Sequence, residues 1–244
     1  MKIVVWFSCG AASAVAAKKT IEKYGKENIR VVNNPIKEEH PDNRRFLKDV
    51  EKWLDIEIES CTNEKYPNAS CVEVWENRRY MSGIAGAPCT LELKKRARQN
   101  WENNNDFDYL VLGFTVEEKN RFDRFKLTER DNILPVLIEA GLTKQDCFEI
   151  LKEANIEIPA IYKHGFPNGN CIGCVKSQSP TYWNLVRREF PDVFKQRAEQ
   201  SRDIGCRLVK FKGKRIYLDE LSPTAVGRPL KNYHIECGIF CDND

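Results

Sequence analysis

Short apolar runs alternate with longer amphipathic segments along the first half of the chain. Runs with the length of β-strands cover Lys2–Phe7, Ile29–Asn33, Ile56–Glu59 and Tyr109–Phe114. Helical segments cover Ala14–Tyr24, Asn43–Leu54 and Leu91–Trp101. Because strand and helix alternate, the pattern predicts an α/β fold with a doubly wound, mostly parallel sheet that carries helices on both faces. Such a sheet binds ligands at the carboxyl ends of its strands, where Ser8, Asn33 and Gly113 are expected to lie.

The pattern changes after about residue 140. A helix is predicted to begin after Thr143, a good N-cap residue, and to end near Ala154. A stretch rich in glycine, proline and asparagine follows. Two helical segments and a hairpin then cover Thr181–Glu189, Val193–Asp203 and Arg207–Leu218. We therefore predict an α/β domain over residues 1–140 and a helical, cysteine-containing extension over residues 141–244, packed on the first domain.

Composition supports a folded protein without a membrane-spanning helix. Of 244 residues, 41% are hydrophobic and 31% are charged, which is ordinary for a globular protein. No apolar run approaches the roughly 18 residues that a transmembrane helix needs. The N-terminus lacks the apolar core of a signal peptide. We therefore expect a cytoplasmic protein with no membrane partner.

The charge of the chain is nearly balanced, with 39 Lys and Arg residues against 36 Asp and Glu residues. This balance does not by itself indicate a nucleic-acid partner. Two local basic segments, Lys94–Arg98 and Lys210–Arg215, have two interpretations. They form either a basic binding surface or a solvated helix face and a solvated hairpin edge.

The turn after the first predicted strand has the composition of a phosphate-binding loop. It reads Ser8-Cys9-Gly10-Ala11-Ala12-Ser13 and leads directly into a helix. Small residues allow backbone amides to approach a phosphate closely, and the N-terminus of a helix carries the positive end of its dipole. Tight packing alone explains such a turn equally well. Its place at the first strand–helix junction is what favours nucleotide binding.

Nearly the whole chain resembles, in order, the N-type ATP pyrophosphatases and the sulfonucleotide (APS/PAPS) reductases, which are adenine nucleotide alpha hydrolase-like proteins. Their loop has the form Ser-Gly-Gly-x-Asp-Ser, and Ser8–Ser13 is similar to it, with Cys9 and Ala12 as replacements. Further similar segments are Asn34–Pro41, Gly113–Arg121 and Leu134–Phe166. The resemblance implies this fold and a nucleotide site made by the loop, Asn33, Gly113 and Arg121.

Two departures from the family pattern bear on the reaction. Ala12 removes the anionic group that the family loop carries, and the arginine expected directly after Gly113 is missing. Guanidinium groups are well suited to hold a sulfate or a 3′-phosphate. The missing arginine therefore favours an ATP pyrophosphatase over a sulfonucleotide reductase, whereas Ala12 leaves the details of catalysis open.

Ten cysteines are many for a chain expected in the cytosol, where disulfides rarely persist. Cys171 and Cys174 have the spacing that brings two thiolates to one metal, although burial as small apolar side chains also explains such a pair. Thiolate sites suit either zinc or a 4Fe-4S cluster, and spacing does not separate the two. The resemblance adds Cys89, which stands where related reductases have a Cys-Cys pair, and implies a 4Fe-4S centre. Cys237 and Cys241 are candidates for its fourth ligand.

The tail segment Glu236-Cys237-Gly238-Ile239 is similar to the reductase tail whose cysteine is the nucleophile. Cys237 is therefore the candidate catalytic residue, as a nucleophile, a cluster ligand or a thiol that relays sulfur.

The resemblance implies first an ATP pyrophosphatase that adenylates an acceptor for sulfur incorporation into nucleic acid, as in bacterial DNA phosphorothioation or tRNA thiolation. Its expected partners are a sulfur carrier, such as a cysteine desulfurase, and nucleic-acid-modification proteins. The alternative enzyme is a sulfonucleotide reductase that releases sulfite. Ala12 leaves open a third interpretation, a non-catalytic nucleotide-sensing subunit.

Overall fold

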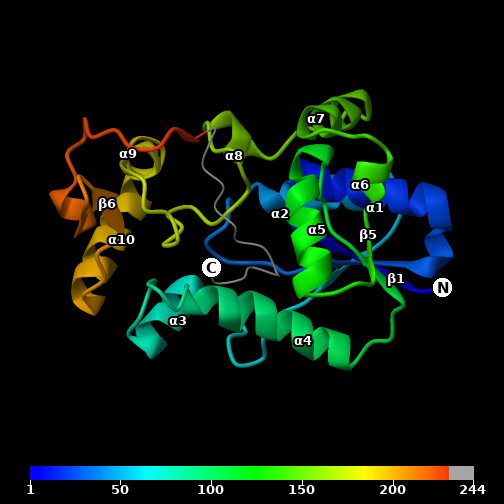
Figure 1. Cartoon of the computed structure of the whole chain (residues 1–244), viewed down its shortest axis with the longest axis horizontal. Helices are drawn as coiled ribbons and strands as arrows, with labels where there is room; N and C mark the ends of the chain where they lie inside the picture. Colours follow the sequence, from blue (N-terminus) through cyan, green and yellow to red (C-terminus); the bar gives the residue numbers. More distant parts are fainter. Residues whose placement is uncertain (231–244) are drawn as a thin grey trace. The chain divides into compact units, whose positions relative to one another are not determined.

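The structure is a computed structural model, and it describes residues 1–230 (Figure 1). The strands are β1 (Ile3–Phe7), β2 (Ile29–Asn33), β3 (Ile58–Ser60), β4 (Tyr109–Val111), β5 (Ile133–Leu134), β6 (Val209–Phe211) and β7 (Lys214–Ile216). The α-helices are α1 (Ala11–Tyr24), α2 (Asn43–Leu54), α3 (Cys71–Arg78), α4 (Arg96–Asn103), α5 (Lys119–Thr128), α6 (Val136–Glu139), α7 (Lys144–Glu153), α8 (Ala160–Lys163), α9 (Pro180–Glu189) and α10 (Pro191–Ile204). Shorter helical turns are η1 (Lys26–Asn28), η2 (Thr90–Lys95), η3 (Val116–Glu118) and η4 (Leu218–Glu220).

The main sheet has five parallel strands in the order β3-β2-β1-β4-β5. Strand β1 is central, pairs with β2 and β4, and is buried along its whole length, as expected for a strand covered on both faces. The chain leaves β1 in one direction to build β2 and β3, and later returns to add β4 and β5 on the other side. This order confirms the predicted doubly wound parallel sheet.

Alternate side chains of β1 serve the two faces of the sheet. Ile3, Val5 and Phe7 belong to the buried cluster that includes α1, α2 and α7. Trp6 lies on the opposite face, where its ring meets that of Trp101 in α4 at 5.4 Å between centroids. Helices therefore cover both faces, as predicted.

Helix α1 begins at Ala11, three residues before the predicted start, because its N-cap is Gly10 in the extended conformation. Early in α1, the small side chains of Ala14, Ala16 and Ala17 are fully buried, so the helix packs closely on the sheet. The predicted N-cap of α7 is confirmed, since the Thr143 hydroxyl accepts the Asp146 amide at 3.1 Å. The predicted helix over 91–101 is instead a π-helical turn, η2, followed by α4.

Residues of the chain group into two compact units. Unit 1 contains residues 1–35, 41–61 and 98–163, and unit 2 contains, among the described residues, 36–40, 62–97 and 164–230. Unit 1 carries the parallel sheet. Unit 2 carries the packed pair α9 and α10 and the antiparallel hairpin of β6 and β7, all of which the sequence predicts. The predicted division into domains at residue 140 stays a prediction.

Helices α3 and α5 are not predicted from the sequence. Each is short and carries two aromatic or branched apolar residues at most on its buried side, which gives a weak periodic signal. Within residues 1–230, no helix has both the length and the apolar character needed to cross a membrane.

Candidate functional site

The loop Ser8–Ser13 connects β1 to α1, and one buried hydroxyl organises it. Ser13 Oγ accepts the backbone N–H groups of Ser8 at 3.2 Å and Gly10 at 3.3 Å, and it donates to the Gly10 carbonyl at 2.8 Å. Ser13 therefore shapes the loop from inside. The exposed Ser8 hydroxyl lies 3.2 Å from the same oxygen and is the better placed of the two to reach a ligand.

Cys9 occupies the left-handed region of backbone conformation, with φ of 54°, which is uncommon for a residue with a side chain. Its neighbour across the sheet holds it there. The Asn33 side-chain amide donates to the Phe7 carbonyl at 2.8 Å and to Cys9 Sγ at 3.5 Å. Asn33 thus lies at the carboxyl end of β2, as predicted, and its hydrogen bonds stabilise the conformation of the loop.

Gly113 follows β4 and touches the backbone of the same loop. A Cβ atom at this position would lie 2.8 Å from the Ser13 nitrogen and 2.9 Å from the Ala12 carbonyl carbon. Because these are backbone atoms at the start of α1, no side chain can move aside. Only glycine allows this contact, so Gly113 belongs with the loop, as the sequence predicts.

Tyr162 is a residue of this site that the sequence analysis does not single out. Its hydroxyl hydrogen-bonds to the Ala11 backbone, at the N-terminus of α1. Burial raises the pKa of Tyr162 to about 12, so the phenol keeps its proton at neutral pH. Its presence in the segment Leu134–Phe166, which resembles the family, is the signal that pointed to it.

A cation accompanies Tyr162. Lys144 Nζ lies 5.4 Å from the centre of the Tyr162 ring, and burial lowers the pKa of this lysine. Helix α7, which Lys144 begins, packs against α1. Lys144 therefore lies beside the same tyrosine whose hydroxyl contacts the start of α1, and the carboxylates of Glu118 and Glu117 act on its charge.

Arg121 lies at the start of α5. It forms an ion pair with Glu118 at 2.7 Å, and its guanidinium lies 5.2 Å from the centre of the Phe114 ring. Gly113 and Arg121 thus remain linked through Phe114. The role of Arg121 toward a nucleotide stays a prediction.

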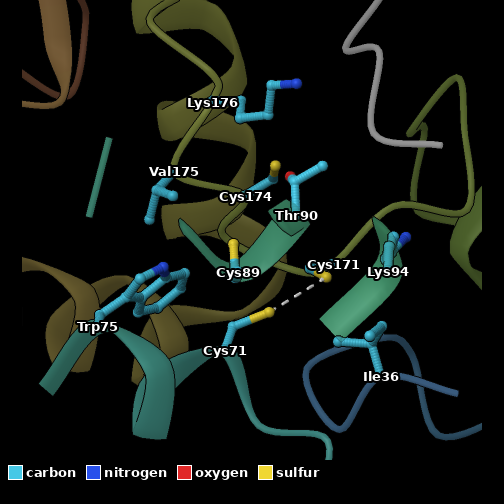
Figure 2. Close-up of a pocket in the computed structure, with 10 residues that line it drawn as sticks. All are labelled: Ile36, Cys71, Trp75, Cys89, Thr90, Lys94, Cys171, Cys174, Val175 and Lys176. Carbon is cyan, nitrogen blue, oxygen red and sulfur yellow. Dashed lines mark hydrogen bonds between the residues drawn. The ribbon is translucent and has the colours of Figure 1, made fainter. Parts of the chain in front are cut away.

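A second candidate site lies in unit 2, where four cysteines line one pocket. Three of them, Cys89, Cys171 and Cys174, are the predicted metal ligands, and the fourth is Cys71 at the start of α3. Figure 2 shows the pocket, in which the sulfur atoms of Cys71 and Cys171 face each other. The other residues that line it are Ile36, Trp75, Thr90, Lys94, Val175 and Lys176.

The thiols of this pocket are close but are not arranged as a finished metal site. Cys71 Sγ and Cys171 Sγ are 4.0 Å apart, near the separation of about 3.8 Å that two thiolates on one tetrahedral zinc ion have. Hydrogen bonds with Cys171 and Cys89, and then burial, hold the pKa of Cys71 well above its ordinary value. Among residues 1–230, however, no three His, Cys, Asp or Glu side chains already converge on one metal position.

The loop that carries the Cys171–Cys174 pair is fixed by Tyr182 and by Glu38. The Tyr182 hydroxyl accepts the Cys174 N–H at 2.8 Å and donates to the Cys171 carbonyl at 3.3 Å. The Glu38 carbonyl accepts the Ile172 N–H at 2.9 Å, while the Glu38 carboxylate accepts the Cys71 N–H at 2.7 Å. Glu38 therefore ties the two cysteine-bearing segments together.

A buried cation lies against these cysteines. Arg197 in α10 is only 3% exposed, and it donates to the Gly173 carbonyl at 3.3 Å and to Gln200. Its guanidinium also covers the Trp75 ring at 4.5 Å. Burial lowers the pKa of Arg197, and the nearby Cys71 acts in the opposite direction.

No carboxylate forms an ion pair with Arg197 in the part of the chain that the structure describes. A buried, uncompensated charge costs roughly several kcal/mol. The Glu38 carboxylate lies close enough to oppose the lowering of the pKa of Arg197 by burial, and thiolates in the adjacent pocket would add further negative charge.

Two further pairs of cysteines differ in whether the structure describes them. Cys237 and Cys241, the catalytic candidate and the candidate fourth ligand, lie outside the described residues. Cys61 and Cys147 are buried in unit 1, and burial raises the pKa of each to about 12, as expected for thiols that act as apolar packing groups. Cys71 was missed because it has no cysteine neighbour in the sequence; the high cysteine count was its one signal.

Comparisons with known proteins add little to this geometry. A scan against protein-family models finds no match, and a search of curated proteins finds no significant match. Among solved structures, the chain is similar to a glutamine-dependent NAD+ synthetase from Acinetobacter baumannii in complex with ADP, with a TM-score of 0.38 and 14% identity. That match covers 100% of this chain and 47% of the synthetase chain, so this chain spans about half of its length. A likeness at this level supports no conclusion about function.

Proposed function

We propose that this protein is an ATP pyrophosphatase that adenylates an acceptor for sulfur incorporation into nucleic acid. The observation that carries the proposal is the loop Ser8–Ser13, a tight turn from the central parallel strand into the N-terminus of α1. Such a junction supports phosphate binding through backbone amides and the helix dipole. Gly113 and Asn33 brace this loop from the two neighbouring strands.

In the proposed reaction, an oxygen of the acceptor attacks the α-phosphorus of ATP. The bond between the α-phosphorus and the bridging oxygen breaks, and pyrophosphate leaves with that oxygen. The loop amides, the positive end of α1 and the Lys144 ammonium would stabilise the negative charge that grows on the leaving group. The terminal sulfur of a persulfide carrier then attacks the adenylated acceptor, and AMP leaves. A thiol reductant cleaves the resulting disulfide, so that one sulfur atom stays on the acceptor and the carrier leaves as a thiol.

The cysteine pocket of unit 2 supports a second part of the proposal, a metal centre held by thiolates. Its four buried thiols are donors of the kind that a 4Fe-4S cluster or zinc takes, and Arg197 would compensate their negative charge. We propose that Cys71, Cys89, Cys171 and Cys174 hold a 4Fe-4S cluster, with zinc as the alternative. Four thiolates leave no open coordination position, so the group would supply a closed, structural or electron-carrying centre.

The nucleotide reaction is tested with ATP, a nucleic-acid acceptor and a persulfide donor. We expect AMP and pyrophosphate as products, and no ADP. ADP and inorganic phosphate would contradict cleavage at the α-phosphorus, and a protein that binds ATP without any cleavage would indicate a nucleotide sensor.

The metal proposal is tested on protein purified without oxygen. We expect iron and acid-labile sulfide in the wild type and neither in the variant with Cys89, Cys171 and Cys174 replaced by serine. Zinc without iron in the wild type would show that the site holds zinc rather than a cluster. The absence of both metals from the wild type would contradict the proposal of a metal site.

A sulfonucleotide reductase remains the second candidate, because the tail segment around Cys237 resembles the nucleophilic tail of those enzymes. The two enzymes differ in what Cys237→Ser removes. In a reductase this substitution eliminates sulfite release from APS or PAPS and leaves nucleotide binding intact. In the pyrophosphatase it spares formation of AMP and pyrophosphate, and sulfite is never formed.

A further inference from the structure

The hairpin of β6 and β7 gathers exposed positive charge in unit 2. Between residues 207 and 218 the sequence has no acidic residue, and all of its cationic side chains are exposed. These cations are Arg207, Lys210, Lys212, Lys214 and Arg215, which we call the basic hairpin. The sequence alone leaves open whether such a segment binds a partner or is simply solvated.

The geometry of the hairpin concentrates this charge. Lys212 and Gly213 both have positive φ, at 47° and 78°, which is the conformation of a tight two-residue hairpin turn. The register places Lys210 directly opposite Arg215 on one face. Like charges in directly opposed positions destabilise a strand pair, so the sequence retains them at a cost in stability.

Acidic residues close to the hairpin do not compensate these cations. Asp219 and Glu220 both pair with Arg202, each at 2.9 Å. Within residues 1–230, no ion pair involves any of the five cations of the basic hairpin. The hairpin therefore presents net positive charge to solvent.

The basic hairpin is also attached to the loop that carries the cysteine pair. The Lys210 N–H donates to the Gln178 carbonyl at 2.9 Å, and the Ser177 N–H donates to the Cys174 carbonyl at 3.0 Å. Strand β6 packs against α9, which follows this segment (Figure 1). Lys176, between the two contacts, lines the cysteine pocket (Figure 2). The segment that connects the hairpin to the cysteine pocket therefore carries one further lysine, Lys176.

We propose that the basic hairpin binds the phosphate backbone of the nucleic acid that accepts sulfur. That this nucleic acid is the sulfur acceptor rests on the proposed function, whereas the binding of nucleic acid rests on the charge of the hairpin alone. Uncompensated Lys and Arg side chains are the groups that bind nucleic-acid phosphates. A membrane fits less well, because none of the exposed large apolar side chains of residues 1–230 lies in the hairpin.

The test measures binding of fluorescent DNA and RNA oligonucleotides, single-stranded and duplex, to the full chain over a series of salt concentrations. The hairpin variant carries Lys210→Gln, Lys212→Asn, Lys214→Gln and Arg215→Gln; asparagine tolerates the left-handed backbone at 212. A matched control carries Lys48→Gln, Lys52→Gln, Lys126→Gln and Lys152→Gln, which are exposed positions of unit 1. Both variants have the same change in net charge.

We expect the hairpin variant to bind at least one of these nucleic acids about tenfold more weakly than the wild type at low salt, and the control to bind like the wild type. The dependence of log K on log salt should become less steep by about 0.7–0.9 for each phosphate contact removed. Equal losses in both variants, or no binding by the wild type, would overturn the inference. Tighter hairpin-dependent binding to anionic lipid vesicles than to nucleic acid would overturn it as well.

Failure of this inference is distinguishable from failure of the proposed function. If the hairpin-dependent binding is found but ATP is never cleaved to AMP, the nucleic-acid surface stands and the reaction fails. If AMP and pyrophosphate form at equal rates in the wild type and the hairpin variant, with no nucleic acid bound, the reaction stands and the surface fails. An unchanged circular dichroism spectrum and melting temperature show that the hairpin variant is folded, whether or not it binds ATP.

Discussion

The phosphate loop of unit 1 and the cysteine pocket of unit 2 are built in different ways. The loop consists of consecutive residues, and its backbone is held by Ser13, Asn33 and Gly113 before any ligand arrives. The pocket draws its four thiols from three separate segments, and the thiols do not yet converge on one position. The first site is therefore preorganised by backbone contacts, whereas the second has suitable donors whose final arrangement depends on what binds.

The difference predicts how each site responds to substitution. In the loop, a larger side chain should be the change that weakens ligand binding most, because a phosphate needs free space next to the backbone amides. In the pocket, loss of a single donor or of a charge should be the damaging change, while volume matters less.

The largest expected effect is in the loop, at Gly10. A Cβ atom here would already lie 3.3 Å from the Tyr162 hydroxyl, and the branches of valine would fill the space before the amides of α1. We expect Gly10→Val to lower the affinity for ATP by about 100-fold or more, because the phosphates can no longer approach the loop. Isothermal calorimetry measures this affinity.

Ala140→Val provides the control for Gly10→Val, since it adds the same kind of branched side chain at an exposed position of unit 1. It should bind ATP like the wild type. Unchanged affinity in Gly10→Val would remove the loop from the nucleotide site.

The next effect is in the pocket, at Cys71. If Cys71 is the fourth ligand, Cys71→Ser should lower the bound metal per chain at least about tenfold in protein prepared without oxygen. The matched control is Cys147→Ser, which also removes a buried thiol but in unit 1, and which should retain the metal. Full metal content in Cys71→Ser would show that Cys71 is not a ligand and would leave Cys237 or Cys241 as the candidate fourth ligand.

The sequence predicts the loop better than the pocket, because the loop consists of consecutive residues and the pocket combines distant segments. The loop, Asn33 and Gly113 are readable because each directly follows a strand, and parallel strands end at one edge of a sheet. The pair Cys171 and Cys174 is readable from its two-residue spacing. Such features depend on neighbours in the chain.

Features that depend on contacts between distant segments are not predicted from the sequence alone. Cys71 meets Cys171 across a separation of 100 residues, and Arg197 reaches the carbonyl between the paired cysteines from α10. Similarly, the contact of Tyr162 with the start of α1 joins the two ends of unit 1. No local period or spacing marks such residues, although the resemblance to a family included Tyr162 in a similar segment.

A smaller effect tests how rigid the loop is. Gly113→Ala places a methyl group 2.8 Å from the Ser13 nitrogen, so either β4 or the start of α1 must shift. Overpacking of this kind costs about 1–3 kcal/mol, and we expect that decrease in the free energy of unfolding by urea. ATP affinity should fall as well, because the loop moves. Unchanged stability and affinity would mean that the loop is not held as tightly as the backbone contact indicates.

The smallest effect, and the sharpest test of the pocket, concerns Arg197. With thiolates and a metal present, the buried guanidinium compensates negative charge, so Arg197→Met should weaken metal binding by about tenfold, as loss of an outer-shell partner does. Without metal, the pocket holds neutral thiols, and the buried guanidinium is compensated only in part, by the nearby Glu38 carboxylate. In metal-free protein, Arg197→Met should therefore leave the melting temperature unchanged or raise it.

Arg197→Lys keeps the charge and should retain more metal than Arg197→Met. A purely structural arginine would instead lower the melting temperature of both forms when replaced, and that result would separate Arg197 from the thiolate centre.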